Sequence, residues 1–391
     1  MPRFSPFPGI RYVRDSLSLV TAPPYDVIDA AERARLVERH QYNAVRVDLP
    51  AGGDDPYGDA AITLQSWLDD GVLAADDPSL YLYRMTFADE AGHEHQTLGV
   101  IGALGLEPAG DGDVLPHEHT TPKAKSDRLD LLRATSMNLS PVWGLSLATG
   151  LSKHLDPSSA RPLGSWQDDD GVGHELWQLT DTGAVDAVVE SVSSAPVVIA
   201  DGHHRYETCL TFAAERPDLA GADATLCFVV ELVEEQLTVQ PIHRLLSGLP
   251  DDFDFLAAFD PYFDVVDIGP LDDDDDITAR LAEHDGLVLV HPHGVRLLHP
   301  KPEALAGARD LDSDRLDIAL ASLPPHTVTF QHGVGNVRGA VERGDADAGV
   351  LLRPPTVEQI AATAHARDKM PPKSTFFWPK PRTGTVFRSL V

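Results

Sequence analysis

Apolar and polar residues alternate along the chain in two rhythms, and each rhythm predicts a different kind of element. Short apolar runs rich in Val, Leu and Ile predict buried strands, and the clearest cover 80–87, 97–106, 197–200 and 225–233. Apolar residues spaced three and four apart predict helices that bury one face, and the clearest cover 60–70, 126–136, 180–191 and 356–366. Strands and helices follow one another throughout, which predicts an α/β protein of the mixed α+β type.

Some stretches carry expectations of their own. Residues 44–49 alternate between apolar and polar and therefore predict a strand. Thr356 with Gln359 three residues later predicts a capped helix start. Residues 153–174 are polar and contain several Pro and Gly, which predicts an exposed insertion. In the helix over 60–70, the side chains expected to face the core are Ile62, Leu64, Trp67 and Leu68.

The length of the chain predicts several subdomains in contact with one another. A chain of 391 residues can bury a large core, and it shows neither internal repeats nor long linkers. We therefore expect two or three packed subdomains. Their expected bounds are 1–106 for an N-terminal α/β part, 107–245 for a central part and 246–391 for a C-terminal α/β part.

The charge of the chain restricts its partners. There are 31 basic and 61 acidic residues, a formal net charge of −30, which disfavours binding to nucleic acid because polyanions repel each other. Lysine is scarce and aspartate abundant. Such a surface suits a very salty cytoplasm, where salt screens the self-repulsion, so we expect a halophilic source.

Other features favour a cytoplasmic protein. No run of 18 apolar residues occurs, so no membrane span is expected, and the first residues lack the apolar segment of a signal peptide. The two cysteines, Cys209 and Cys227, lie in apolar surroundings. They predict buried thiols in a reducing compartment, and neither a disulfide nor a zinc site.

The stretch 196–208 carries the most chemistry. Its apolar run predicts a strand, Asp201 and Gly202 a tight turn, and the residues from Tyr206 a helix. The first N–H groups of such a helix lack partners and attract anions. We expect Asp201 to cap the helix and Gly202 to let a ligand approach the backbone. Arg205 adds donors that match a phosphate.

The histidines of this turn, His203 and His204, leave two interpretations open. They could donate protons, orient a phosphate or bind a metal, or they could simply be solvated. The lysines leave a similar choice. Five of the seven lie in two segments, which indicates anion contacts or chance clustering, and these five are Lys123, Lys125, Lys369, Lys373 and Lys380.

The chain resembles the family catalogued as domain of unknown function 1015. The motif from Asp201 to Arg205, Asp-Gly-His-His-Arg, is similar to the phosphate-binding motif of the ParB/sulfiredoxin-like superfamily, in the form found in its free-serine kinases. That part of the resemblance covers about residues 110–215 and implies a nucleotide-binding core. The segments that match the family are 22–28, 115–120, 131–135, 138–141, 201–205, 243–246 and 370–375.

The resemblance implies a small-molecule kinase that transfers a phosphoryl group from ATP or ADP, with Mg²⁺, to free serine or a similar metabolite. It implies that Glu118, in a Pro-His-Glu segment, is the general base. The other implied catalytic residues are Asp201, which is also the implied metal ligand, His203 and His204. The implied nucleotide-binding residues are Gly202, His203, His204, Arg205, Thr208 and Lys123.

Other functions stay open. A nucleotide-binding regulator or slow nucleotide hydrolase would need no small-molecule acceptor and no Glu118. Sulfiredoxin-like transfer to an oxidised cysteine is disfavoured, because His203 and His204 stand where that chemistry needs a cysteine. No lysine follows a glycine, which excludes a P-loop. The expected partners are a nucleotide and a small-molecule substrate, without nucleic acid or membrane, and a homodimer stays open.

Overall fold

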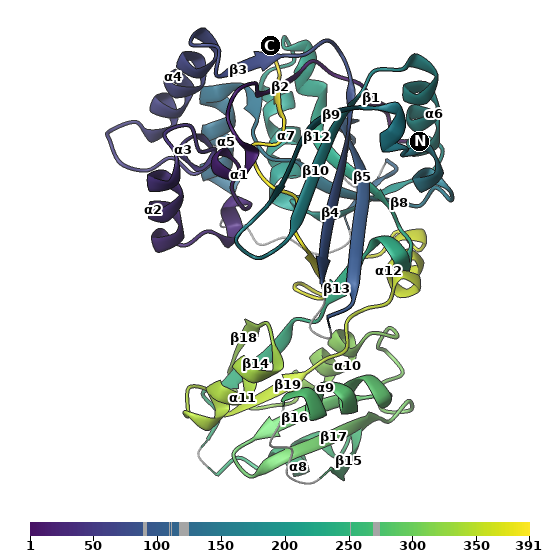
Figure 1. Cartoon of the computed structure of the whole chain (residues 1–391). Coiled ribbons are helices and arrows are strands. Elements are labelled where there is room, and N and C mark those ends of the chain that lie inside the picture. Colours follow the sequence, from purple (N-terminus) through teal and green to yellow (C-terminus); the bar gives the residue numbers. More distant parts are fainter. Residues whose placement is uncertain (89–91, 109, 111, 117–124, 251, 269–273) are drawn as a thin grey trace. The chain divides into compact units, whose positions relative to one another are not determined.

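A computed structural model describes residues 1–88, 92–108, 110, 112–116, 125–250, 252–268 and 274–391. The chain forms two compact units (Figure 1). Unit 1 holds Met1–Thr238 together with Pro379–Val391, and unit 2 holds Val239–Trp378. These units divide the chain differently from the three parts expected from the sequence. Strands on either side of the expected boundary at residue 106 are neighbours in one sheet, so no boundary separates them.

Unit 1 is built on a long mixed sheet of nine strands among the described residues. Eight of them lie in the order β6 (Val114–Pro116), β11 (Val197–Asp201), β8 (Val142–Ser146), β12 (Ala224–Glu231), β5 (Glu94–Gly105), β4 (Leu80–Ala88), β10 (Gly173–Leu179) and β9 (Arg161–Gln167). The ninth, β1 (Phe4–Ser5), pairs with β5. Two parallel pairs, β6 with β11 and β8 with β12, lie at one end of an otherwise antiparallel sheet.

A smaller sheet and several helices complete unit 1. The smaller sheet has the order β3 (Leu73–Ala75), β2 (Gly9–Tyr12), β21 (Phe387–Ser389) and β7 (Met137–Asn138). Figure 1 shows α2, α3 and α4 gathered on one side of the long strands and α6 on the other. The α-helices are α1 (Leu17–Val20), α2 (Ala30–Arg39), α3 (Val45–Asp48), α4 (Pro56–Asp69), α5 (Lys125–Thr135), α6 (Thr182–Val192) and α7 (His203–Glu215).

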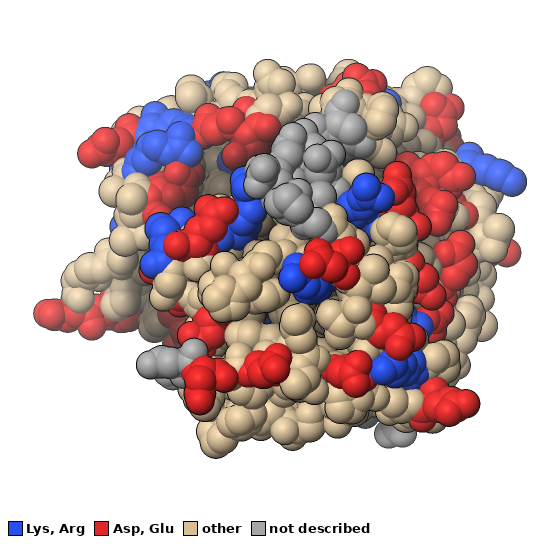
Figure 2. Space-filling model, turned by 90° about the horizontal axis from the view of Figure 1, so that it is seen from below, with Lys and Arg blue, Asp and Glu red and all other residues tan. Residues whose placement is uncertain are grey.

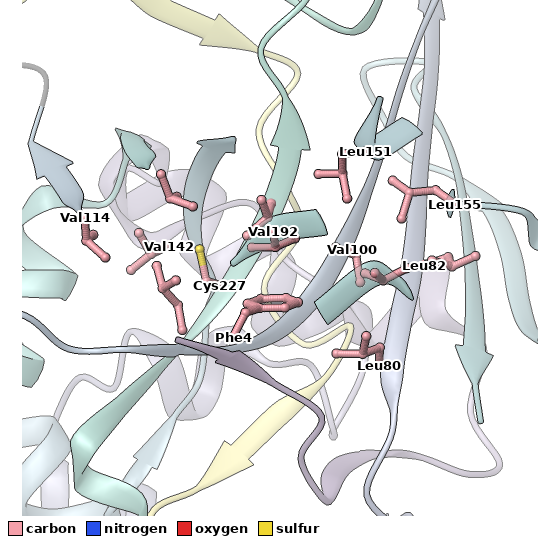
Figure 3. Close-up of a cluster of buried hydrophobic side chains, with 14 of the residues drawn as sticks. Phe4, Leu80, Leu82, Val100, Val114, Val142, Leu151, Leu155, Val192 and Cys227 are labelled. Atoms are coloured by element: carbon pink, nitrogen blue, oxygen red, sulfur yellow. The ribbon is translucent and has the colours of Figure 1, made fainter. Parts of the chain in front are cut away.

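The main core of unit 1 lies between α6 and the long sheet (Figure 3). Val188 and Val192 of α6 are fully buried against strand residues such as Leu80, Leu82 and Val100. Burial of each such side chain contributes on the order of 1.5–3 kcal/mol. The central strands therefore hold the start of α7, which follows β11, in a fixed place.

Unit 2 is a second α/β body with its own core. Its main sheet has the order β15 (Phe263–Asp267), β17 (Gly294–Pro300), β16 (Leu287–His291), β19 (Ala348–Leu351), β14 (His243–Ser247) and β18 (Thr327–Gln331). A short ladder pairs β13 (Thr238–Gln240) with β20 (Phe376–Trp378). The helices are α8 (Phe255–Phe259), α9 (Asp274–Glu283), α10 (Asp312–Leu320), α11 (Val334–Glu342) and α12 (Val357–His365), the last with the predicted capping box of Thr356 and Gln359.

Three local predictions are wrong. Residues 44–49 form the short helix α3 and no strand, because the segment is buried on both of its alternating sides and the Asn43 side chain accepts from Val45 N. Residues 153–174 form no simple insertion, since β9 lies within them and pairs with β10. Ile62, expected in the core, is 70% exposed.

The surface and the thiols agree with the composition. Figure 2 shows acidic side chains across most of the face that it presents, with basic side chains set among them. Both cysteines are free and buried, as predicted. Among the described residues, no helix is long and apolar enough to cross a membrane.

Candidate active site

The motif from Asp201 to Arg205 joins the end of β11 to the start of α7. Gly202 has φ of +90° and is the N-cap of α7, which begins at His203 and not at Tyr206 as predicted. The first intrahelical bond runs from Tyr206 N to Gly202 O. The N–H groups of His203, His204 and Arg205 therefore precede the helical ladder, and the helix dipole makes this end electropositive.

Asp201 does not cap α7, so this prediction is wrong. Its Oδ2 accepts from Arg205 Nη2 at 2.5 Å and its Oδ1 accepts from Lys380 Nζ at 2.8 Å. Burial raises the pKa of Asp201, but the charges of Lys380 and Arg205 outweigh burial and hold this pKa well below its usual range. Asp201 is therefore a carboxylate shared by two cations.

Arg205 is folded back under the start of its own helix. Its Nη1 donates to the carbonyl oxygen of Pro141, and the residue is 8% exposed. A Cβ placed on Gly202 would lie 3.0 Å from the guanidinium carbon of Arg205. Burial lowers the pKa of Arg205, but the nearby carboxylates, Asp201 foremost, raise it overall. Arg205 fixes Asp201 and the strand end, and glycine at position 202 makes room for it.

Lys380 reaches this cluster from the C-terminal segment of unit 1. Its Nζ also donates to Asp26 Oδ2 at 3.1 Å, so one ammonium group bridges two carboxylates. Burial lowers the pKa of Lys380, while Asp201 and Asp26 raise it, and the net shift is upward. Of the clustered lysines, Lys380 thus contacts the motif, through its hydrogen bond to Asp201.

A second ion pair, Arg128 with Asp48, lies beside the pair of Asp201 and Arg205. Arg128 of α5 donates from Nη1 to the Asp48 backbone oxygen at 2.6 Å and lies 3.5 Å from its Oδ1. The same guanidinium lies 4.2 Å from the centre of the Tyr25 ring. Burial raises the pKa of Asp48 despite Arg128 nearby. Thr383 Oγ1 donates to Asp48 Oδ2 at 3.4 Å, which ties the C-terminal segment to α3.

A small cavity of about 50 Å³ opens between these groups. Arg128, Arg205, Asp48 and Thr208 lie in its wall. Thr208 is 5% exposed, and its Oγ1 finds no hydrogen-bond partner among the described residues. Since a buried hydroxyl without a partner is costly, a polar group or water of the site is expected there.

The two histidines lie in the first turn of α7. His203 is buried and lies close enough to Asp201 to lower the pKa of the Asp201 carboxyl group. His204 is half-buried, and its Nδ1 is buried without a hydrogen-bond partner in the described parts of the chain. Glu118 and Lys123 lie outside the described residues. The last described residue before them, Pro116, is the register partner of Ile199, two positions before Asp201.

The described carboxylates do not offer Mg²⁺ a protein-built site. Among the described residues there is no group of three or more His, Cys, Asp or Glu that could hold a metal ion. Both oxygens of Asp201 accept from cationic side chains, and Lys380 stands between Asp201 and Asp26, where a shared divalent ion would stand.

Sequence reasoning missed part of the cluster. Asp48 and Arg128 carry no local signal, because an Asp within a valine-rich run and an Arg on a polar helix are common. Asp26 and Tyr25 also belong to the cluster, because the structure brings them to Lys380 and Arg128 respectively.

Comparisons with known proteins give a family and several similar structures. The model of a family described as protein of unknown function (DUF1015) matches residues 4–319. The search of curated proteins gave no match.

A conserved hypothetical protein from Pyrococcus furiosus is 12% identical, with a TM-score of 0.37, and the match covers 71% of this chain and 92% of that chain. A free serine kinase in complex with AMP is 11% identical, with a TM-score of 0.37 and coverage of 68% and 83%. SbnI with a C-terminal truncation, from Staphylococcus aureus, is 10% identical, with a TM-score of 0.40 and coverage of 73% and 85%. These TM-scores are too low to assign a function to this chain.

Proposed function

The chain belongs to the DUF1015 family, and we propose that it is a phosphotransferase that moves a phosphoryl group from ATP or ADP to the hydroxyl group of free serine or a similar small metabolite. The observation that carries the proposal is the buried cluster of Asp201, Arg205 and Lys380 at the start of α7. It stands on the motif whose form resembles that of the free-serine kinases.

Local electrostatics supports a phosphate ligand. The whole chain carries a net charge of −30, which repels anions. In the cluster, however, Arg128, Arg205 and Lys380 balance the three carboxylates of Asp26, Asp48 and Asp201. The electropositive end of α7 adds N–H donors without intrahelical partners, so a phosphate meets attraction here and repulsion elsewhere.

Each group has a distinct task in the proposed reaction. Gly202 has no side chain and lets a phosphate approach the N–H groups of His203 and His204. Lys380 and Arg205 hold Asp201, so that the strand end and the helix start keep one geometry during transfer. Preorganised donors and charges of this kind are the main means by which proteins promote phosphoryl transfer.

The chemical step needs an acceptor for the hydroxyl proton. The resemblance assigns this task to Glu118, and we retain it as part of the proposal. The acceptor oxygen forms a bond to phosphorus while the bond from phosphorus to the leaving phosphate oxygen breaks. The leaving nucleotide, ADP or AMP, keeps the electron pair, and the hydroxyl proton moves to the Glu118 carboxylate.

A direct assay tests the proposal. Purified protein in molar KCl with MgCl₂ is given ATP or ADP and serine, and ³¹P NMR follows the formation of a phosphomonoester. We expect product with one of the two donors and at least a tenfold loss of rate in Lys380→Met. Lys301→Met is the matched control, because Lys301 also lies near two aspartates but belongs to unit 2.

Other outcomes separate the alternatives. If serine gives no product, other hydroxyl metabolites are tested in its place. Nucleotide binding or slow release of inorganic phosphate, without any phosphorylated acceptor, would replace the kinase with the nucleotide-binding regulator or hydrolase. If the protein neither binds nucleotide nor forms product, the proposed nucleotide site at the start of α7 is refuted.

A further inference from the structure

Unit 2 contains a cavity of about 200 Å³ that the motif in unit 1 does not explain. Its wall is formed by the start of β14, the end of β19 with the residues after it, and the starts of α10 and α12. At about 30 Å³ for each water in the liquid, this space holds some six or seven waters, or a metabolite of similar volume.

The buried side of the cavity is positive. Arg244 is 2% exposed and donates from Nη1 to Ile242 O at 2.6 Å, with its guanidinium 4.7 Å from the centre of the Phe330 ring. The start of α10 adds the positive end of a nine-residue helix whose N-cap, Leu311, provides no side-chain cap.

Hydroxyl groups stand beside this positive end. Ser313 and Ser374 are buried, and their Oγ atoms lie 3.0 Å apart. Both residues line the cavity with Arg244. Ser374 Oγ donates to Pro371 O at 2.8 Å and therefore accepts from Ser313, so the two hydroxyls hold the wall together. The guanidinium of Arg244 and the start of α10 remain as the groups that match a carboxylate.

The exposed side of the cavity is negative. The side chains of Asp285 and Asp310 are each 79% exposed. Asp285 Oδ1 lies 2.7 Å from Arg353 Nη1, and Asp310 Oδ1 accepts from Arg315 Nη2 at 2.5 Å. Both of these contacts use Oδ1. These acids are therefore the groups at the cavity mouth that suit an ammonium ion.

The third aspartate of the wall, Asp312, has a different task. It is buried and accepts hydrogen bonds from Arg353 N, Nε and Nη2 and from Arg315 Nη1. Its acceptor capacity is used by the protein, so it fixes the wall and does not recognise a ligand.

Positive and negative charges of the wall are separated in space, and a further carboxylate, Asp317, lies behind it, where burial raises its pKa and the charge of Arg244 partly offsets this rise. Three arginines, Arg244, Arg315 and Arg353, stand against Asp285, Asp310 and Asp312. Burial separates a positive inner end from a negative mouth. A single anion or a single cation would satisfy one end and leave the other unused.

We propose that this cavity binds a small zwitterion, an α-amino acid, with its carboxylate toward Arg244 and the start of α10 and its ammonium toward Asp285 and Asp310. This proposal does not depend on the phosphotransferase proposal, because every residue of the cavity belongs to unit 2. The site is therefore a second ligand site, separate from the cluster in unit 1.

A binding screen with the full chain tests the proposal. Each of the twenty L-amino acids is added without nucleotide, and binding is measured by calorimetry. The tightest binder is then compared with its amine analogue, which lacks the carboxylate, and its acid analogue, which lacks the ammonium. We expect each analogue to bind at least about tenfold more weakly, because each one loses its hydrogen bonds to charged groups at one end of the cavity.

Variants assign the binding to the cavity. Asp285→Asn with Asp310→Asn changes two exposed side chains and should weaken binding about tenfold or more without unfolding the protein. Arg244→Gln tests the inner end, with circular dichroism to confirm its fold. Asp345→Asn is the control, since this aspartate also pairs with an arginine but lies outside the cavity. Lys380→Met should leave the binding unchanged.

Three results would overturn the proposal. They are the absence of binding by any amino acid, equal binding of either analogue, and binding that survives the double aspartate variant but is lost in Lys380→Met. The last would assign the amino acid to the cluster in unit 1. If the protein shows no phosphotransferase activity, the proposed amino-acid site is not affected, and the binding screen still tests it.

Discussion

Replacing Gly202 by alanine measures how much the fold depends on the guanidinium beneath the motif. Two effects act at this position. Gly202 has φ of +90°, which costs an L-residue about 1–2 kcal/mol. The new Cβ would also lie 3.0 Å from both Cζ and Nε of Arg205. To relieve this contact, the guanidinium must move away from Asp201 and from the Pro141 carbonyl.

Gly150 provides a matched control for the first effect. Its φ of +91° is nearly the same, but a Cβ there meets only Lys153 Cδ at 3.8 Å within 4 Å. Gly150→Ala should therefore lower the free energy of unfolding only by the cost of the backbone conformation, about 1–2 kcal/mol. Gly202→Ala should lower the free energy of unfolding by a further amount of about 1.5–3 kcal/mol, the contribution of a hydrogen bond to a charged group. The expected totals are about 1–2 kcal/mol for Gly150→Ala and about 2.5–5 kcal/mol for Gly202→Ala.

Urea unfolding in molar KCl, followed by tryptophan fluorescence, gives both free energies. The signal reports mainly on unit 1, because four of the five tryptophans lie there and Trp378 lies in unit 2. In an Arg205→Met background, the extra loss caused by Gly202→Ala should disappear, since the clash partner is gone. Equal losses for the two glycine variants, within about 0.5 kcal/mol, would refute the role given to Arg205.

Three further predictions follow from charge and burial. The urea midpoint should rise between 0.1 M and 2 M KCl because salt screens the net charge of −30, and a flat response would contradict a halophilic protein. Burial lowers the pKa of His243 to about 4, below its unfolded value of about 6.5. Protonation therefore favours the unfolded chain, and stability should fall by about 3 kcal/mol from pH 6.5 to pH 4. His243→Asn, which keeps an acceptor for Leu352 N, should remove that fall in circular-dichroism titrations; an unchanged fall would contradict it. Burial raises the pKa of Cys209 and of Cys227, so both thiols should resist iodoacetamide until urea unfolds unit 1, whereas rapid native labelling would contradict their burial.

Local patterns in the sequence predict much of the fold. The apolar run before Asp201 and the breaker-free stretch after it predict β11 and α7, and both are present. Such elements depend on neighbours close in sequence. Residues 44–49 show the limit of that reasoning, because alternation predicts a strand only when one of the two sides is exposed. Here both sides are buried, and the segment is a helix.

The candidate site depends on contacts that no local pattern encodes. The sequence singles out Asp201 and Arg205 but gives Asp201 the task of a helix cap. Its carboxylate is instead held by Arg205 and by Lys380, which lies 179 positions away. The scarcity of lysine marks Lys380 as a candidate, whereas its two carboxylate partners become visible only in the folded chain. The pairing of Arg128 with Asp48, 80 positions apart, has the same origin.

Glu118→Gln tests the central claim most directly, because a kinase needs this carboxylate and a nucleotide sensor does not. Nucleotide affinity and transfer to the acceptor are measured side by side in the same variant. Binding should stay within about threefold of the unchanged protein, while transfer should fall by about 10²–10⁴, the usual contribution of a general base. Transfer within a few fold of the unchanged rate would contradict the assigned base and, with it, the proposed mechanism.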